Sequence, residues 1–355
     1  MLTIVCSPVA KELVPVLQHW FYGIFVDMFD WLSKLYLHFA FLAAFVLCTA
    51  FVSAQGFQRY LVPEEVIDYP QRLQVLWAND FFFLTDRYYT NGVEIEYHRQ
   101  QLGNSVLSRL LFDPLVDSKP IYSLVLKHEI YTPRNVLGDP SFNDRPYAGV
   151  LLLGFKGAFY DVDHQYVLSS TIQAGLLGRW AGGQFVQNGI HFLLPASEPI
   201  PGWDFQIHQD VLLSYLVDYQ KLLLDRGDFQ IDALAATSLG LPLTDFSGGI
   251  RLRYGKGVTF FTPQHLLSVE GMQYNFFAEA SARYVVYDAT LQGGVFNRGS
   301  PHTIEIINPL LAQVKAGASF RYHKVITEIG GQWVSSKFEN ALSHKWGYFV
   351  IGFLF

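Results

Sequence analysis

The sequence has little charge. Only 16% of its 355 residues are charged, whereas average globular domains carry about a quarter. Lysine and arginine number 25 against 31 aspartates and glutamates, so the formal net charge is −6. A protein that binds nucleic acid through a basic surface needs the opposite balance, and we expect no nucleic-acid partner. The 50% hydrophobic content excludes intrinsic disorder.

The sequence is also poor in cysteine, with only Cys6 and Cys48. Residues 55–355 therefore cannot use thiol catalysis or cysteine-ligated metals, and they suit an oxidising compartment. The chain lacks a G-x-S-x-G elbow, an H-E-x-x-H helix, a P-loop and a dinucleotide fingerprint. An enzyme built from it would depend on histidine, carboxylates, hydroxyls and an oxygen-ligated cation.

Long apolar runs are missing after residue 54, although the mean hydropathy is +0.19. Before that point, residues 39–52 are almost wholly apolar and end at Val52-Ser53-Ala54. This pattern is typical of a secretory signal cleaved after Ala54, and an uncleaved anchor is the alternative. Residues 1–54 are thus interpreted as a signal peptide with an upstream extension, since a start at Met28 would give a short leader. Residues 55–70 form a lead-in, and 71–355 form one domain.

Apolar and polar side chains alternate along the mature chain. In residues 93–98 the odd positions are apolar and the even positions are Glu, Glu and His. Similar alternation in 72–77, 165–175 and 303–306 predicts β-strands with one apolar face. A soluble sandwich and a membrane barrel both fit this pattern.

Three features favour an antiparallel transmembrane β-barrel. Residues 347–355 form an alternating strand with an aromatic last residue, which a barrel would close against the first strand. Aromatics cluster at 81–83, 88–89 and 284–287, as in interfacial girdles. The third feature is the export signal. The expected fold is all-β, with roughly 10 to 14 strands at about ten residues a strand.

Polar residues gather in three clusters, each of which also has a structural interpretation. Asn79 and Asp80 precede a turn that they would cap, and the hairpin would bring them near Thr90. Asp144 and Arg145 would pair inside the barrel. His191 follows a glycine-rich run, and a single histidine is usually packed or solvated.

The motifs, taken together, resemble the outer-membrane lipid A deacylases, enzymes that remove the 3'-linked acyloxyacyl group of lipid A. The matching segments occur in the family's order across residues 72–355. They are Asn79-Asp80, residues 85–92, 129–133, 143–149, 182–188 with His191, 290–293 and the Phe-rich C-terminus.

The resemblance implies a twelve-stranded barrel with a calcium-dependent site inside it, near the outer leaflet. The family's motif histidine falls on His191, its Asn-Asp pair on Asn79 and Asp80, and its threonine on Thr90. Its glutamate falls on Glu198, one residue further from the histidine than in the family. Arg134 and Arg145 are candidates for binding the substrate.

These residues suit ester hydrolysis by an activated water. His191 would act as general base, with Asn79 or Asp80 orienting it, and Thr90 would hold the water or a substrate oxygen. Asp80 and Glu198 would ligate Ca²⁺, which stabilises the oxyanion. We expect the protein to hydrolyse an ester of lipid A, its substrate, and to be surrounded by outer-membrane lipids. A non-enzymatic barrel, either a narrow pore or a structural protein, and a hydrolase of another envelope lipid are the alternatives.

Overall fold

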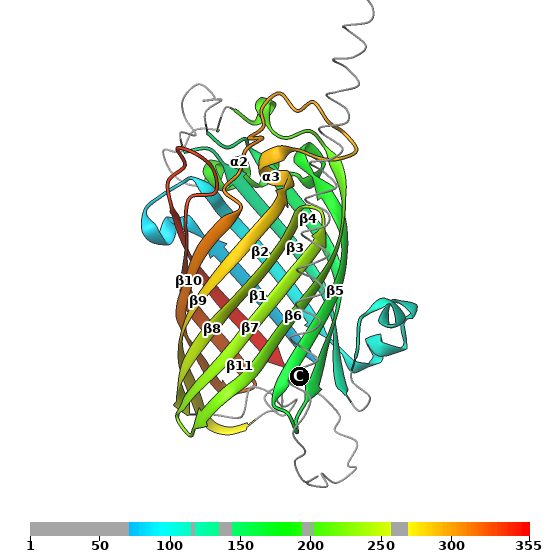
Figure 1. Cartoon of the computed structure of the whole chain (residues 1–355), viewed down its shortest axis with the longest axis vertical. Coiled ribbons are helices and arrows are strands. Elements are labelled where there is room, and N and C mark those ends of the chain that lie inside the picture. The colour runs from blue at the N-terminus through cyan, green and yellow to red at the C-terminus, as the bar shows by residue number, and fades with distance from the viewer. Residues whose placement is uncertain (1–70, 115–117, 135–143, 194–199, 201, 257–268) are drawn as a thin grey trace, which may run out of the picture. The chain divides into compact units, whose positions relative to one another are not determined.

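The computed structural model describes residues 71–114, 118–134, 144–193, 200, 202–256 and 269–355. These residues form twelve strands in a closed antiparallel barrel in which each strand pairs with its neighbours in sequence and β1 pairs with β12 (Figure 1). The predicted signal peptide and lead-in, residues 1–70, lie outside the described part. Within the described residues no helix has the length and apolar character needed to cross a membrane.

The strands are β1 Arg72–Asn79, β2 Tyr88–His98, β3 Lys119–Thr132, β4 Ala148–Asp161, β5 Tyr166–Leu177, β6 Asp210–Arg226, β7 Phe229–Gly240, β8 Leu243–Lys256, β9 Val269–Asp288, β10 Leu310–His323, β11 Val325–Val334 and β12 His344–Leu354. The helices are α2 Gly183–Leu193 and α3 Ala289–Gln292. Five 3-10 turns complete the set: η1 Asp80–Phe83, η2 Gln100–Asn104, η3 Val106–Leu110, η4 Gly178–Ala181 and η5 Trp203–Phe205.

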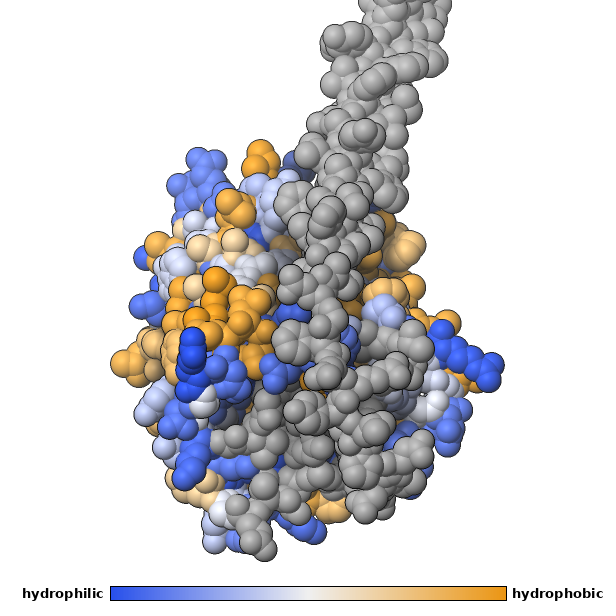
Figure 2. Space-filling model, turned by 60° about the horizontal axis from the view of Figure 1, so that its bottom comes forward, coloured by the Kyte–Doolittle hydropathy of each residue, from blue (hydrophilic) through white to orange (hydrophobic). Residues whose placement is uncertain are grey.

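Alternation along the strands separates a polar lumen from an apolar exterior. Glu94, Glu96 and His98 line cavities inside the barrel, as their even positions predict. Phe349 and Phe353 are exposed on the outside, whereas Tyr348 and Val350, on either side of Phe349, are buried. On the face drawn in Figure 2, hydrophobic residues gather in a patch, with hydrophilic residues below it.

Loop lengths distinguish the two ends of the barrel. Long connections after β1, β3, β5, β9 and β11 lie at one end, together with α2 and α3 (Figure 1). The other end has the tight turns β4–β5, β6–β7 and β10–β11, together with the longer connection between β2 and β3. Outer-membrane barrels keep short turns on the periplasmic side, so the end with α2 and α3 is extracellular.

Two expectations about local structure were wrong. Residues 303–306 are not a strand but lie in the loop before β10, where Ile304 N donates to Leu291 O. Tyr88 and Tyr89 were expected in an interfacial girdle, yet both line the cavity in the extracellular half of the lumen, here called the upper cavity. The Tyr88 hydroxyl accepts a hydrogen bond from Leu342 N there.

Candidate active site at the extracellular end

Asn79 begins the site, at the point where β1 ends and η1 starts. Its side-chain oxygen accepts from Phe81 N at 2.7 Å, which is the capping role that a turn residue usually has. Its amide nitrogen also donates to Asn91 Oδ1 at 3.3 Å, and Trp77 Nε1 donates to the same oxygen at 2.9 Å. The strand pairing thus brings Asn79 to the residue next to Thr90, as the hairpin predicted.

Asp80 is a buried carboxylate, 1% exposed. Its Oδ2 accepts from Thr85 Oγ1 at 2.8 Å and from Arg87 N at 2.7 Å. Burial raises the pKa of Asp80 to about 7, against these two hydrogen bonds, and the nearby Asp86 raises it further. No described residue forms an ion pair with Asp80, so a hard cation would suit this carboxylate.

Thr90 occupies a bulge in β2, between Tyr89 and Asn91. Its hydroxyl lies 2.5 Å from that of Thr132 on β3. Glu129 and Tyr131 line the lumen, so Thr132, one residue on, faces the outside of the wall. The Thr90 hydroxyl therefore belongs to the outer face.

This placement corrects the expectation of a site inside the barrel. Leu76 and Ala78 line the lumen cavity, so Asn79 lies on the opposite face of β1, with the exposed Trp77. Among the described residues, the lining of the lumen cavities does not include Asn79, Asp80 or Thr90. Successive side chains of a strand point to opposite faces, so an error of one residue in the assignment moves a side chain from the lumen to the outer face.

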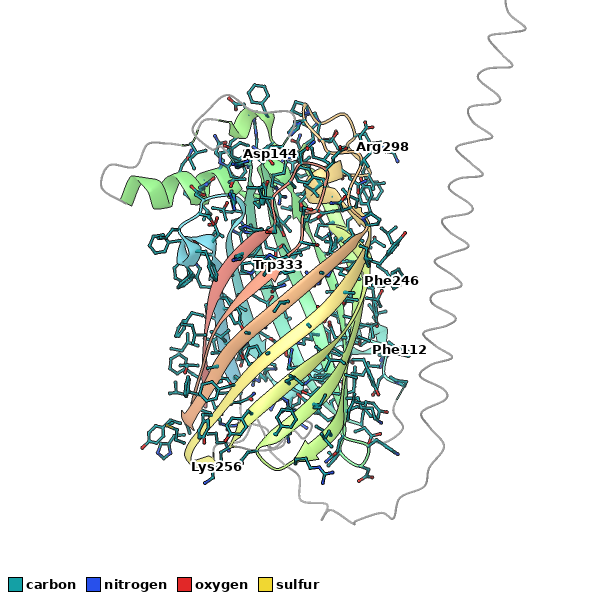
Figure 3. All side chains as sticks on the ribbon, turned by 60° about the vertical axis from the view of Figure 1, so that its left-hand side comes forward. Phe112, Asp144, Phe246, Lys256, Arg298 and Trp333 are labelled. Atoms are coloured by element: carbon teal, nitrogen blue, oxygen red, sulfur yellow. The ribbon has the colours of Figure 1, made fainter. Side chains whose placement is uncertain are left out.

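Helix α2, which carries His191, packs on the outside of the same wall (Figure 3, green helix). Gly183 N lies 3.1 Å from the point where a Cβ on Gly149 would sit. Val186 packs against the buried cluster of Ile130, Tyr147, Ile200 and Trp203. The two glycines allow this close approach of helix and strand, since neither has a side chain.

The other residues of the Gly182–Asn188 motif fasten α2 to the loop that follows. Gln187 Oε1 accepts from the indole of the buried Trp203 at 2.9 Å, and Asn188 Oδ1 accepts from Ile200 N at 3.0 Å. His128, which motif reading missed, reaches Ala181 O at 3.0 Å from the outer face of β3. His128 pairs in register with Val93 on β2 and Leu151 on β4, and its closeness to Ala181 depends on the loop after β5, which the motifs do not indicate. The backbone of His191 belongs to α2, whereas its side chain and Glu198 lie outside the described residues.

The two arginines lie elsewhere. Arg145 is 2% exposed and lines the upper lumen cavity, where it donates to the Thr290 hydroxyl at 3.0 Å and lies over the Tyr131 ring. The Asp144 carboxylate accepts hydrogen bonds from the backbone N–H groups of Arg145 and Arg134, at 2.8 Å and 2.5 Å. It therefore closes the loop through backbone groups, where a side-chain pair with Arg145 was expected. Arg145 is thus separated from Thr90 by the barrel wall, and the exposed Arg134 lies in the extracellular loop.

Apolar side chains border the site on both sides. Phe82 and Phe83 of η1 pack over Gly347 and Gly331 on the outer wall, while Phe81 and Leu84 are exposed. Phe185 of α2 is exposed on the other side. The described residues hold no group of three or more His, Cys, Asp or Glu side chains that could bind a metal. A cation at Asp80 would depend on carbonyl oxygens and on residues outside the described part.

The chain matches the model of one protein family, described as outer membrane protein LpxR, over residues 39–355. Its fold is similar to that of LpxR from Salmonella typhimurium, with a TM-score of 0.65 and 21% identity, covering 80% of this chain and 100% of that one. The β domain of the Bordetella autotransporter BrkA is also similar, with a TM-score of 0.46 and 11% identity, over 81% of this chain and 100% of that one. None of the curated proteins compared with the chain matches it.

Proposed function

Because the chain belongs to the outer membrane protein LpxR family, we propose that it is a calcium-dependent lipid A deacylase that releases the 3'-linked acyl or acyloxyacyl group. The protein is an integral β-barrel of the outer membrane. The observation that carries the proposal is the buried Asp80 at the extracellular end, which forms no ion pair among the described residues. It directly follows Asn79, whose strand partner is the neighbour of Thr90, and α2 packs on β3 and β4 of the same wall.

The site's place on the outer face supports a lipid substrate. Lipid A lies in the outer leaflet, so its ester could reach a site on the wall sideways without passing through the lumen. The exposed Phe81, Leu84 and Phe185 offer apolar surface to its acyl chains. A site within the lumen would instead require the chains to cross a polar interior.

In the proposed reaction, His191 takes a proton from a water molecule, whose oxygen attacks the ester carbonyl carbon. The bond between the acyl carbon and the sugar oxygen then breaks, and protonated His191 returns its proton to that oxygen, giving a free carboxylic acid and a sugar hydroxyl. Thr90 holds the water or a substrate oxygen. Asp80 and Glu198, with carbonyl oxygens, would hold Ca²⁺, which supplies positive charge for the oxyanion.

The test is acyl release from lipid A by the purified barrel in the presence of calcium, followed by mass spectrometry. We expect loss of the 3'-linked group, and unchanged acylation with calcium present would refute the proposal. The same assay on a diacyl phospholipid examines the alternative substrate class.

The role of His191 has its own test. His191→Ala should reduce release by two or more orders of magnitude while the barrel keeps its heat-modifiable migration. His164→Ala is the matched control, because the His164 imidazole is hydrogen-bonded to Asp161 at a periplasmic turn, at the opposite end of the barrel from α2. Full activity of His191→Ala would remove His191 from the mechanism.

A further inference from the structure

The connection between β2 and β3 does not stay at the periplasmic end of the barrel. Residues 100–112, here called the shelf, fold back along the outside of the wall as η2 and η3 (Figure 1, cyan, beside β5). Figure 3 shows Phe112 outside the wall, above the level of Lys256 at the periplasmic end. The shelf therefore lies beside the membrane-spanning strands.

Specific contacts hold the shelf on the wall. Leu111 is buried against Phe155, Phe159 and Leu168, which lie on β4 and β5. These three side chains face outward, because Lys156 and Ala158 between them line the lumen, as do Val167 and Ser169 beside Leu168. Phe155 pairs with Ile172, halfway along both strands, so the shelf reaches the middle of the wall.

Several backbone groups of the shelf are hydrogen-bonded within the protein. Consecutive 3-10 bonds join Leu102 N to Arg99 O, Ser105 N to Leu102 O, Ser108 N to Ser105 O and Leu111 N to Ser108 O. The Ser108 hydroxyl donates to Gly103 O at 2.8 Å, and Ser105 Oγ accepts from Leu107 N at 3.2 Å. The Tyr215 hydroxyl of β6 accepts from Phe112 N and donates to Leu110 O. Such internal pairing lowers the cost of placing a non-helical segment against hydrocarbon.

The exposed side chains of η3 and Phe112 are mostly apolar, whereas those of η2 include Gln100, Gln101 and Asn104. Val106 is 72% exposed, and Leu110 and Phe112 are each 52% exposed. Arg109, the one charged residue of the shelf, is exposed beside them. Exposed apolar area costs about 25 cal/mol per Å² in water, and a long arginine beside it can reach toward a polar headgroup.

We propose that the shelf is embedded in the periplasmic leaflet of the outer membrane and binds a glycerophospholipid. Acyl chains cover Val106, Leu110 and Phe112, and the phosphate group pairs with Arg109. The proposal rests on the barrel's location and on the shelf's own contacts. It is independent of the proposed deacylase chemistry, which lies at the opposite end of the strands.

Spin labels test the depth of the shelf. Single cysteines at Val106 and Leu110, in a chain with Cys6→Ser and Cys48→Ser, are labelled with a nitroxide in phosphatidylglycerol and phosphatidylethanolamine vesicles. We expect high collision rates with oxygen and low rates with a water-soluble nickel chelate, as for a label at the lipid-facing Leu213. A label at Asp228, in a periplasmic turn, gives the aqueous reference.

Two results would overturn the proposal. Nickel accessibility at Val106 equal to that at Asp228 would place the shelf in water. Spin–spin broadening at Val106 that disappears on dilution with unlabelled protein would make a second copy of this chain the occupant.

Arg109→Gln tests the headgroup contact. The affinity of the detergent-solubilised barrel for short-chain phosphatidylglycerol should fall about tenfold, as expected for loss of a hydrogen bond between charged groups. Arg99→Gln is the matched control, because Arg99 Nε already donates to Gln101. Unchanged affinity in Arg109→Gln, or equal losses in both variants, would refute the role of Arg109. Acyl release should remain at the wild-type rate in both.

Discussion

At Gly183 the chain passes so close to its neighbours that a Cβ would lie 2.7 Å from the Trp203 ring and 3.2 Å from Gly149 Cα. Gly183→Ala should therefore push α2 away from the wall, at a cost of about 1–3 kcal/mol. We expect slower acyl release and faster hydrogen exchange of the α2 amides. The barrel's heat-modifiable migration should be unchanged, since α2 lies outside the strand ladder.

Gly189 in the same helix is the matched control. A Cβ there meets nothing within 4 Å, and alanine favours a helix over glycine by about 1 kcal/mol. Gly189→Ala should thus preserve or slow the exchange of α2. If both alanine variants behave alike, the close approach of α2 to β4 has no part in activity.

The buried Asp80 gives a prediction about calcium. Asp80→Asn removes a charge but keeps the shape of the side chain, so the barrel should fold while acyl release falls at least about a hundredfold. A chelator should reduce the wild-type rate to a similar level, and added calcium should restore only the wild type. Asp204→Asn, at an exposed carboxylate, is the control. A wild-type calcium response in Asp80→Asn would contradict the assigned ligand.

Among the elements, β7 and β8 are joined inside the lumen by Arg253 and Asp232. Their nitrogen and oxygen atoms lie 2.6 Å and 2.8 Å apart, and Asp232 is fully buried. Asp232→Asn removes the charge of the carboxylate that accepts both bonds from Arg253, and breaking a buried pair in this way costs about 3–5 kcal/mol. The urea midpoint of the barrel should fall clearly, measured by heat-modifiable migration.

The exposed pair Arg179–Asp204, 3.9 Å apart, sets the scale for comparison. Surface pairs contribute at most about 1 kcal/mol, so Asp204→Asn should leave the urea midpoint nearly unchanged. Equal shifts in the two variants would mean that the lumen pair does not hold β7 to β8.

Sequence alternation predicted the strands well where a strand separates lipid from lumen. Glu94 and Glu96 had to face inward because charge in the lipid layer is costly. The same pattern failed at residues 303–306, because four alternating residues also occur in loops. Tyr88 and Tyr89 failed as girdle residues because a bulge and bonds to Leu342 and His344 hold them over the lumen.

The site was predicted less completely than the strands. The hairpin correctly joined Asn79 to the neighbourhood of Thr90, since local pairing follows from the turn. The prediction that the site faces the lumen was wrong, because the face depends on a register that a single sequence does not determine. The partner of Arg145 was also missed, since Thr290 is distant in sequence and only barrel closure brings α3 to it.

For the whole molecule, the lumen bears on whether the protein is a pore. A cavity of about 400 Å³ lies in the extracellular half and one of about 430 Å³ in the periplasmic half. Lys315 lines the first, Glu328 lines the second, and the two side chains pair at 3.9 Å. Arg251 and Glu279 form a further pair at 2.8 Å. Charged side chains thus lie between the two cavities.

We therefore expect no steady conductance from the wild-type barrel in planar bilayers. Replacing Lys315, Glu328, Arg251 and Glu279 together by alanine should open a measurable current, because it removes both charge and side-chain volume. A wild-type conductance comparable with that of the alanine variant would favour the pore alternative.

The pairing of β1 with β12 has a consequence for how the protein reaches its native state. Gln71 and Phe355 exchange two backbone hydrogen bonds across this seam, although nearly the whole described chain separates them in sequence. Contacts of such long sequence separation form slowly, since the entropy of closing the chain must be lost first. Until the seam forms, β1 and β12 each carry an open row of backbone donors and acceptors that can join another chain. Closure of the ring should therefore be the slow step of biogenesis and the stage most prone to aggregation.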